Sequence, residues 1–291
     1  MRQNHLPIAL ATSAAFPELD SDDANLRAEL AARGLEARPA IWTDASIDWA
    51  TFSLCVLRST WDYFHRVDEF AQWIARVATA TSLWNPASVV LPNLDKTYLR
   101  ALAAQGVPIV ATEWIAPGVD VRALLDARGF QRVVLKPSVS GNAHRTVRAT
   151  LGDAAQQARA LFDAGERALM VQPYLEAIER EGELSLVFID GALSHAVRKS
   201  PAAGDFRVQE GHGGTTTRVT PSDEARSVAT RALAAIGERT LYARADLVRD
   251  ASGALVVMEL ELTEPSLYFA LAPEGAARFA DAIAAELHAR G

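Results

Sequence analysis

The first third of the chain alternates runs of consecutive apolar residues with amphipathic segments. Residues 67–79 carry apolar side chains at helical spacing, and runs such as 54–57 are apolar throughout, as buried strands are. We expect strands at 8–10, 35–42 and 54–57 and helices at 22–33 and 67–79. This order of strands and helices predicts a parallel sheet covered by helices.

The pattern changes after a Pro- and Asn-containing stretch at 84–93, which we interpret as a crossing linker. Strands then follow one another more closely, as in α+β domains. The expected strands are 107–110, 133–136, 169–171, 183–189, 193–199, 218–219, 242–248 and 255–260, and the expected helices are 95–104, 153–164, 222–239 and 273–289. A parallel layer followed by strand-rich α+β segments predicts a multi-domain α/β enzyme.

The amino-acid composition limits the classes of protein to which this chain can belong. Of the 291 residues, 49% are hydrophobic and 22% are charged, as expected for a globular protein with a core. The 29 Lys and Arg against 36 Asp and Glu give a net charge of −7, which argues against sequence-independent binding of nucleic acid. No apolar run reaches the roughly 18 residues of a membrane-spanning helix, and we expect no membrane partner.

The single cysteine, Cys55, lies in an apolar run and has no partner for an internal disulfide. We expect a buried structural thiol in a reduced, cytoplasmic setting. One cysteine and six scattered histidines also argue against a zinc site, and the first ten residues do not have the pattern of a signal peptide.

A strand that ends at Lys136 opens into a loop of small residues, 137–142, which includes Ser140 and Gly141. Backbone N–H groups and hydroxyls of such a loop can surround a polyphosphate, with the lysine as counter-charge. The spacing is not that of a Walker A loop, and a plain surface turn is the alternative.

Three acidic residues, Asp246, Glu259 and Glu261, fall on two expected neighbouring strands. A period of two puts Glu259 and Glu261 on one face and turns Met258 and Leu260 toward the core. Carboxylates this close repel one another unless a cation joins them, and oxygen ligands suit Mg²⁺. The alternative is a solvent-facing acidic strand edge.

Two further segments can contact an anionic ligand or a nucleotide. Lys199 precedes a glycine-rich stretch, 204–214, that contains Arg207, and both cations could close over an anionic substrate. Residues 172–176 follow a strand and could pair with a purine edge and hold a ribose. The alternatives are a mobile loop and a simple connector.

The segment 58–63 directly follows a strand of the expected parallel sheet, where such sheets bind ligands. Arg58, with Ser59 beside it, could clamp a carboxylate, and Asp62 could bind an ammonium group. Trp61 and Tyr63 could form a pocket wall, or could merely pack between domains.

The order of these segments resembles the ATP-grasp superfamily, nearest to its branch of glutathione synthetases and ribosomal-protein glutamate ligases. The resemblance covers about residues 90–270, and Gly204–Gly214 is similar to that branch's G-D-F-R-x-N-x-x-x-G-G segment. It implies an N-terminal α/β domain on the substrate side (1–94), a central subdomain (95–172) and a C-terminal subdomain with the metal site (173–291), the last two clamping ATP.

The resemblance also implies roles for individual residues. Residues matching ATP-binding positions are Lys96, Lys136, Ser140, Gly141, Gln172, Tyr174, Leu175 and Glu183, with Glu176 as the alternative ribose ligand. Arg207 matches the arginine that steadies the transferred phosphate. Asp246, Glu259 and Glu261 match the Mg²⁺ ligands, although the family usually has Asn where this chain has Glu261.

The chemistry implied is ATP-dependent activation of a carboxylate as an acyl phosphate, which a nitrogen nucleophile then attacks. Arg58–Tyr63 and Met258–Ser266 resemble a small subgroup that includes a cyclo-ligase forming D-cycloserine from O-ureido-D-serine. An intramolecular nucleophile would need no second amino-acid pocket.

Three alternatives stay open: a ligase that joins two molecules, a nucleotide-binding regulator without turnover, and, last, a dinucleotide-binding module, since no G-x-G-x-x-G follows the first strand. A homo-oligomer is also left open.

Overall fold

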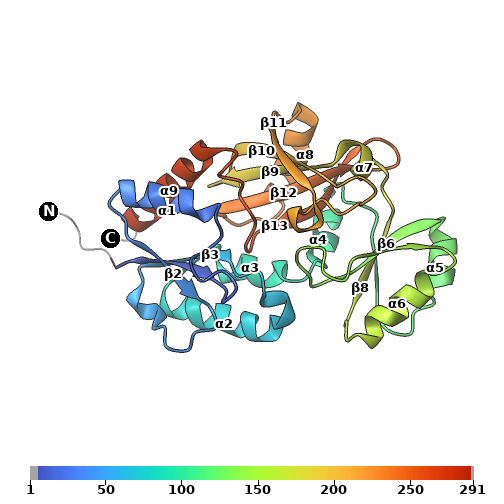
Figure 1. The fold of residues 1–291 in the computed structure, drawn as a ribbon, viewed down its shortest axis with the longest axis horizontal. Helices are drawn as coiled ribbons and strands as arrows, with labels where there is room; N and C mark the ends of the chain where they lie inside the picture. The colour runs from blue at the N-terminus through green and yellow to red at the C-terminus, as the bar shows by residue number, and fades with distance from the viewer. Residues whose placement is uncertain (1–5, 290–291) are drawn as a thin grey trace.

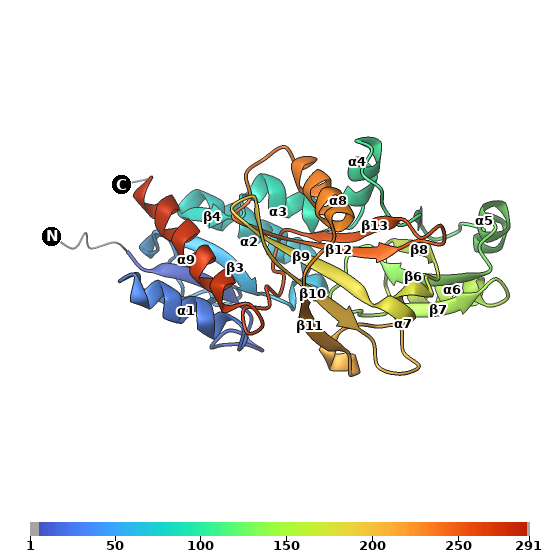
Figure 2. The same cartoon turned by 90° about the horizontal axis from the view of Figure 1, so that it is seen from above.

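The structure, a computed structural model, describes residues 6–289 and contains three sheets (Figure 1). Their strand orders are β2-β1-β3-β4, β5-β8-β6-β7 and β11-β10-β9-β12-β13. Along the long axis of the molecule, the first sheet and the second lie toward opposite ends, and the third lies between them (Figure 2).

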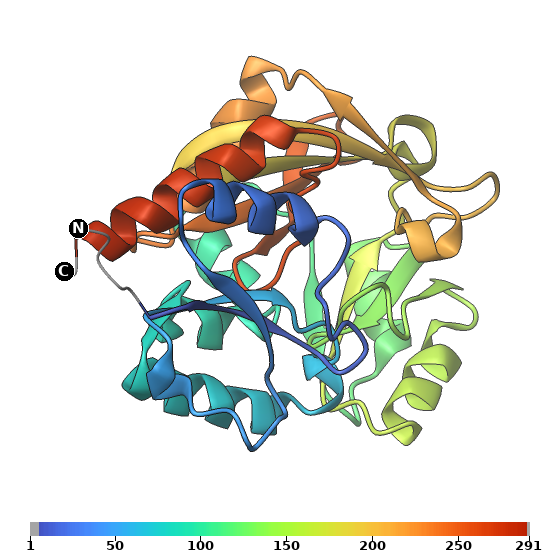
Figure 3. The ribbon, with the colours of Figure 1, turned by 60° about the vertical axis from the view of Figure 1, so that its left-hand side comes forward.

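The first sheet is parallel throughout, as predicted, and is covered on both faces. Along β1, Ile8 and Leu10 belong to a core shared with α1 and α9, whereas Ala9 and Ala11 belong to a core shared with α2. The helices α1 and α9 lie on one side of this sheet and α2 lies on the other (Figure 3). The elements are β1 (Ile8–Thr12), α1 (Asp23–Ala32), β2 (Ala37–Ile41), β3 (Leu54–Ser59), α2 (Val67–Ala80), β4 (Ser82–Trp84) and α9 (Pro273–His288). The C-terminal helix therefore completes the core of the first sheet.

The other two sheets are antiparallel. The second sheet consists of β5 (Glu113–Ile115), β6 (Arg132–Pro137), β7 (Val147–Thr150) and β8 (Leu169–Pro173), with α5 (Val121–Arg128) and α6 (Ala154–Asp163). The third sheet consists of β9 (Glu183–Ile189), β10 (Ala192–Ser200), β11 (Thr215–Val219), β12 (Tyr242–Arg249) and β13 (Leu255–Glu261), with α8 (Asp223–Ala234). Shorter elements are η1 (Trp49–Thr51), η2 (Tyr63–His65), α3 (Ala87–Asn93), α4 (Tyr98–Ala104), α7 (Ala177–Glu181) and η3 (Glu210–His212).

Two predictions about local structure are wrong. The stretch 84–93 is not only a linker, because it contains α3, whose Val89 and Val90 are buried. Packing of these side chains outweighs the turn signal of the two prolines. Residues 107–110 form no strand, and only Ile109 makes an isolated bridge, to Val257.

A register shift between β12 and β13 affects the predicted acidic face. Asp246 pairs with Glu259, but the next residue, Leu247, pairs with Val257, so Met258 is the extra residue of a bulge. Met258, predicted to face the core, packs against the hydrophobic cluster that includes Leu175 and Val256, and its side chain also lines the same cavity as Glu259.

Candidate functional site

A cavity of about 840 Å³ is lined by residues of the second and third sheets, by the loops at their edges, and by the segments that follow β1 and β3 of the first sheet. It has the size of a small-molecule site. The predicted site residues that line it are Tyr63, Lys96, Lys136, Ser140, Gly141, Gln172, Tyr174, Leu175, Glu183, Lys199, Arg207, Asp246, Glu259 and Glu261. Residues more than a hundred positions apart in the sequence thus face a common space.

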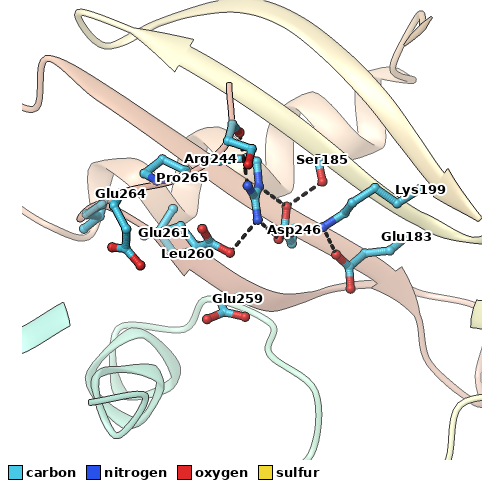
Figure 4. Close-up of polar contacts among 12 residues, drawn as sticks. Glu183, Ser185, Lys199, Arg244, Asp246, Glu259, Leu260, Glu261, Glu264 and Pro265 are labelled. Atoms are coloured by element: carbon cyan, nitrogen blue, oxygen red, sulfur yellow. Dashed lines mark hydrogen bonds and ion pairs between the residues drawn. The ribbon is translucent and has the colours of Figure 1, made fainter. Parts of the chain in front are cut away.

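Asp246 lies at the centre of a buried charge network on β12 (Figure 4). Its carboxylate accepts hydrogen bonds from Ser185 Oγ at 2.6 Å, from Lys199 Nζ at 3.0 Å, and from Arg244 Nε and Nη2, each at 2.9 Å. Burial acts to raise the pKa of Asp246, but Arg244 and Lys199 outweigh it and hold the pKa below its ordinary value. The carboxylate is ionised and fully engaged.

Lys199 joins two carboxylates, those of Glu183 and Asp246. Burial opposes the charge on Lys199, but these two carboxylates outweigh it and raise its pKa. Lys199 lines the cavity, but its ammonium group bridges two acids; its predicted contact with an anionic substrate stays a prediction. Glu183, the predicted ribose ligand, is one of these two acids and is held by its ion pair with Lys199.

The two predicted phosphate lysines have different surroundings. Lys96 Nζ lies 2.9 Å from Glu259 Oε1 and donates to the carbonyl oxygen of Ser140 at 2.6 Å. For Lys136, the contact found among residues 6–289 is Met258 Sδ at 3.7 Å, and no carboxylate lies within 4.0 Å of its ammonium group. Burial lowers the pKa of Lys136. A half-buried lysine that lines the cavity without a paired carboxylate suits an anionic ligand.

The loop after β6 contains three non-glycine residues in the left-handed region of φ. Asn142, Ala143 and Arg145 have φ values of 51°, 55° and 52°. Gly141 packs under the Phe64 ring from η2, and a Cβ at Gly141 would lie 3.1 Å from that ring. The predicted small-residue loop is therefore held against the N-terminal sheet's edge.

The predicted adenine segment lies at the exit of β8. Gln172 Nε2 donates to Thr112 Oγ1 at 2.9 Å, and Leu175 is buried. The ring of Tyr174 lies under the guanidinium of Arg132, whose Cζ is 4.2 Å from the ring centroid. Phe206 of the glycine-rich segment lies 6.1 Å from Tyr174, centroid to centroid. This contact brings the glycine-rich segment next to the predicted adenine segment, at the cavity.

Within the glycine-rich segment, Arg207 forms an ion pair with Asp205 at 2.7 Å. The segment folds back on itself so closely that a Cβ at Gly214 would clash with the backbone oxygen of Val208. Arg207 lines the cavity, but its guanidinium is engaged by its neighbour rather than by the acidic network.

Three of the predicted substrate residues do not line the cavity. Arg58 is 2% exposed, and its Nε donates to Asp23 Oδ1 at 2.7 Å; Ser59 Oγ donates to Asp23 Oδ2 at 3.2 Å. Asp62 accepts a hydrogen bond from Trp42 Nε1 at 2.7 Å. In this structure the polar groups of these three side chains bond to residues around the first sheet and do not face the cavity, which does not support the predicted substrate contacts.

The structure adds residues that the sequence analysis did not single out. Arg244 lies two positions before Asp246 on β12, and the strand's period of two could have revealed it as a member of the same face. It bonds to Asp246, to Glu261 and, at 3.1 Å, to the carbonyl oxygen of Ser266. Glu264 and Tyr268, on the segment after β13, also line the cavity.

The predicted three-carboxylate metal site does not form as such. Within the part of the chain that the structure describes, no three His, Cys, Asp or Glu side chains are arranged to hold a metal ion. All three carboxylates line the cavity, but Asp246 has both oxygens engaged by Arg244, Lys199 and Ser185. The pKa of Glu261 is raised to about 7 by burial, against the effect of Arg244.

No helix within residues 6–289 combines the length and apolar character needed to cross a membrane.

The segments that match known proteins cover nearly the whole chain. Residues 8–85 match the family model of the N-terminal domain of D-cycloserine synthetase DcsG, and residues 95–267 match that of the RimK-like ATP-grasp domain. The chain is 36% identical to the cycloserine biosynthesis protein DcsG of Streptomyces lavendulae, over 96% of this chain and 98% of that protein.

Solved structures agree with the sequence matches. The crystal structure of D-cycloserine synthetase DcsG has a TM-score of 0.88 and 34% identity, over 96% of this chain and 99% of that one. A D-alanine–D-alanine ligase from Bacillus anthracis complexed with ATP has a TM-score of 0.69 at 16% identity, over 98% of this chain and all (100%) of that one. These similarities confirm the predicted ATP-grasp fold.

Proposed function

Because the chain belongs to the RimK-like ATP-grasp family, we propose that this ligase closes the ring of D-cycloserine from O-ureido-D-serine, with release of ADP and phosphate. The family uses ATP and Mg²⁺, and we propose that this chain does so too. The observation that carries the proposal is the 36% identity to DcsG over 96% of the chain, which includes the substrate-side sheet as well as the ATP-grasp region.

The reaction needs activation because a carboxylate resists attack by a nucleophile. Transfer of the terminal phosphoryl group of ATP to the substrate carboxylate gives an acyl phosphate, whose C–O bond breaks when nitrogen attacks. In O-ureido-D-serine the ureido-side nitrogen attached to oxygen attacks, phosphate leaves and the five-membered ring closes. The nitrogen loses its proton, and its carbamoyl group must then be transferred to water to leave D-cycloserine.

The cavity's cations suit this chemistry, which consists of positioning and charge neutralisation. We assign Lys136, together with the loop that contains Ser140 and Gly141, to the phosphates of ATP. Lys96, between α3 and α4, and Arg244, on β12, support them. We assign Tyr174 and Leu175 to the adenine.

The donor set also accommodates Mg²⁺, which proteins usually bind through one or two carboxylates together with substrate phosphates. Glu259 and Glu261 would hold the ion, and Lys199 and Arg244 keep Asp246 behind them as a fixed negative charge. The ion would neutralise charge on the phosphates during transfer. Arg207 would reach the transferred phosphate after exchanging Asp205 for it.

The remaining part of the cavity suits a small substrate. Trp61, Tyr63 and Phe16 line this end, and Trp61 and Phe16 meet edge to face with centroids 5.0 Å apart. An attacking nitrogen within the substrate itself needs no second amino-acid site. We further propose a cytoplasmic location, since the cysteine, Cys55, is free and buried.

Measuring ADP release with O-ureido-D-serine as the sole amino acid tests the proposal. We expect ATP- and Mg²⁺-dependent turnover without added amine, with D-cycloserine identified by mass spectrometry. Turnover that requires a second amino acid would instead establish a ligase that joins two molecules.

The variant Glu259→Ala separates an enzyme from a nucleotide-binding regulator. We expect it to lose at least about a hundredfold in kcat, because a metal carboxylate and the partner of Lys96 are removed together. ATP binding by the wild-type protein without any ADP release would favour the regulator.

A further inference from the structure

Glu264 follows β13 and occupies a fixed place in the cavity wall. Its carbonyl oxygen accepts a hydrogen bond from Trp61 Nε1 at 2.9 Å, and the carbonyl oxygen of Pro265 accepts one from Arg58 Nη2 at 3.2 Å. The backbone is thus tied on both sides to the N-terminal sheet's edge. In Figure 4 its carboxylate lies at the opposite end of the acidic row from Glu183 and Lys199.

The carboxylate of Glu264 differs from its neighbours in lacking a cation. Ion pairs hold the other acids of the row: Asp246 and Glu261 with Arg244, Glu259 with Lys96, and Glu183 with Lys199. Within residues 6–289, no lysine, arginine or histidine nitrogen lies within 4.0 Å of the Glu264 carboxylate, and no hydrogen bond reaches it.

An unpaired carboxylate in a partly buried wall is unfavourable unless a ligand supplies the missing charge. Burial, with a further contribution from Glu261, raises the pKa of Glu264 to about 8. The nearest electrostatic partners, Lys96 and Arg244, are engaged elsewhere, as described above. The site therefore offers a place for one positive charge.

We propose that Glu264 binds the α-ammonium group of the amino-acid substrate. This inference rests on the proposed function and names the group that fixes the substrate's orientation. In an amino acid the ammonium group is on the carbon next to the carboxylate, so its partner must lie close to the site of activation. Glu264 lies three residues after Glu261 and lines the same cavity as Lys136 and Glu259, which we assign to the phosphates and the metal ion.

Two ligands and two variants test this assignment. The ligands are O-ureido-D-serine and 3-(ureidooxy)propanoate, which lacks only the ammonium group; their Kd values are measured by calorimetry with Mg²⁺ and ADP present. The variant Glu264→Gln keeps the shape and removes the charge. Asp22→Asn is the matched control, because Asp22 also lines the cavity and accepts a hydrogen bond from the Ala270 N–H at 2.9 Å.

We expect Glu264→Gln to weaken the binding of O-ureido-D-serine at least about tenfold. The same variant should change the affinity for 3-(ureidooxy)propanoate less than about twofold. Asp22→Asn should affect both ligands equally and slightly. In turnover, Glu264→Gln should raise KM for O-ureido-D-serine and leave KM for ATP unchanged. Thermal melting of each variant verifies that it is folded.

Equal losses for the two ligands in Glu264→Gln would overturn the assignment, as would discrimination carried by Asp22 instead. The proposed function fails separately. Binding of O-ureido-D-serine that depends on Glu264, but without ADP release, would support the ammonium site and overturn the cyclo-ligase. Failure of the wild-type protein to bind either ligand would overturn both.

Discussion

Lys136 carries its charge in an environment that opposes it. Burial lowers the pKa of its ammonium group, and Lys96 acts in the same direction, while Glu259 acts against both. A lysine is charged below its pKa, so a lowered pKa brings the loss of charge to a lower pH than the ordinary 10.5. Any anion that depends on this charge should bind less well on the alkaline side.

We therefore predict that ATP affinity is constant at low pH and falls as pH rises through the pKa of Lys136, by about tenfold per pH unit above it. Calorimetric Kd values between pH 7 and 10 would measure this. Lys136→Arg is the control, since arginine keeps its charge over the whole range and should give a flat profile. The same alkaline loss in Lys136→Arg would show that another group is responsible.

Individual residues differ in how well their position in the site could be predicted from the sequence. Glu259 and Glu261 could be assigned to one face because strand periodicity is local. Arg58 could not be assigned correctly, because its partner Asp23 lies 35 positions earlier and nothing local indicates the pair. Glu264 follows a recognisable motif, but its importance depends on the absence of a nearby cation, which is a property of the folded chain.

Among the elements, the glycine-rich segment between β10 and β11 is the one we expect to respond to nucleotide. It touches the rest of the site through Phe206, which contacts the Tyr174 ring and lies 5.0 Å from Arg148 Cζ, and Arg207 bonds within the segment. Phosphate would offer Arg207 a better partner than Asp205, and the segment would then be held over the cavity.

We predict that ATP with Mg²⁺ slows tryptic cleavage after Arg207 at least about fivefold, because proteolysis requires local opening. Cleavage after Arg249, next to the turn between β12 and β13, is the internal reference and should not change. Mass spectrometry of the fragments over time gives both rates. Equal rates at Arg207 with and without nucleotide would contradict closure of this segment.

The elements themselves were largely predictable, with exceptions that have a common cause. The strand β1 is a dense apolar run, and α2 has a clear helical period. The helix α3 was missed because its prolines dominate the local signal, whereas burial of Val89 and Val90 decides the structure. The bulge at Met258 depends on pairing between two strands and has no signature in either alone.

At the scale of the whole molecule, the cavity depends on how the first sheet is joined to the third. Asn85, which directly follows β4, is fully buried at 0% exposure. Its Nδ2 donates to the carbonyl oxygens of Tyr242 at 2.9 Å and Leu262 at 2.7 Å, and its Oδ1 accepts from the N–H of Leu241 at 2.7 Å. One side chain therefore fixes both strands of the β12–β13 pair, at the end away from their turn, to the first sheet.

We predict that Asn85→Ala lowers the free energy of unfolding by about 3 kcal/mol, because it leaves three buried backbone groups without their partner. Thermal melting should shift down by several degrees, and Asn25→Ala on α1 is the control, since an alanine inside a helix costs nothing in propensity. Because Leu262 follows Glu261 directly, the loss should extend to function, with a raised KM for ATP at temperatures where the variant remains folded. If the variant melts at the same temperature as the wild type, packing of the hydrophobic cores alone holds the sheets around the cavity.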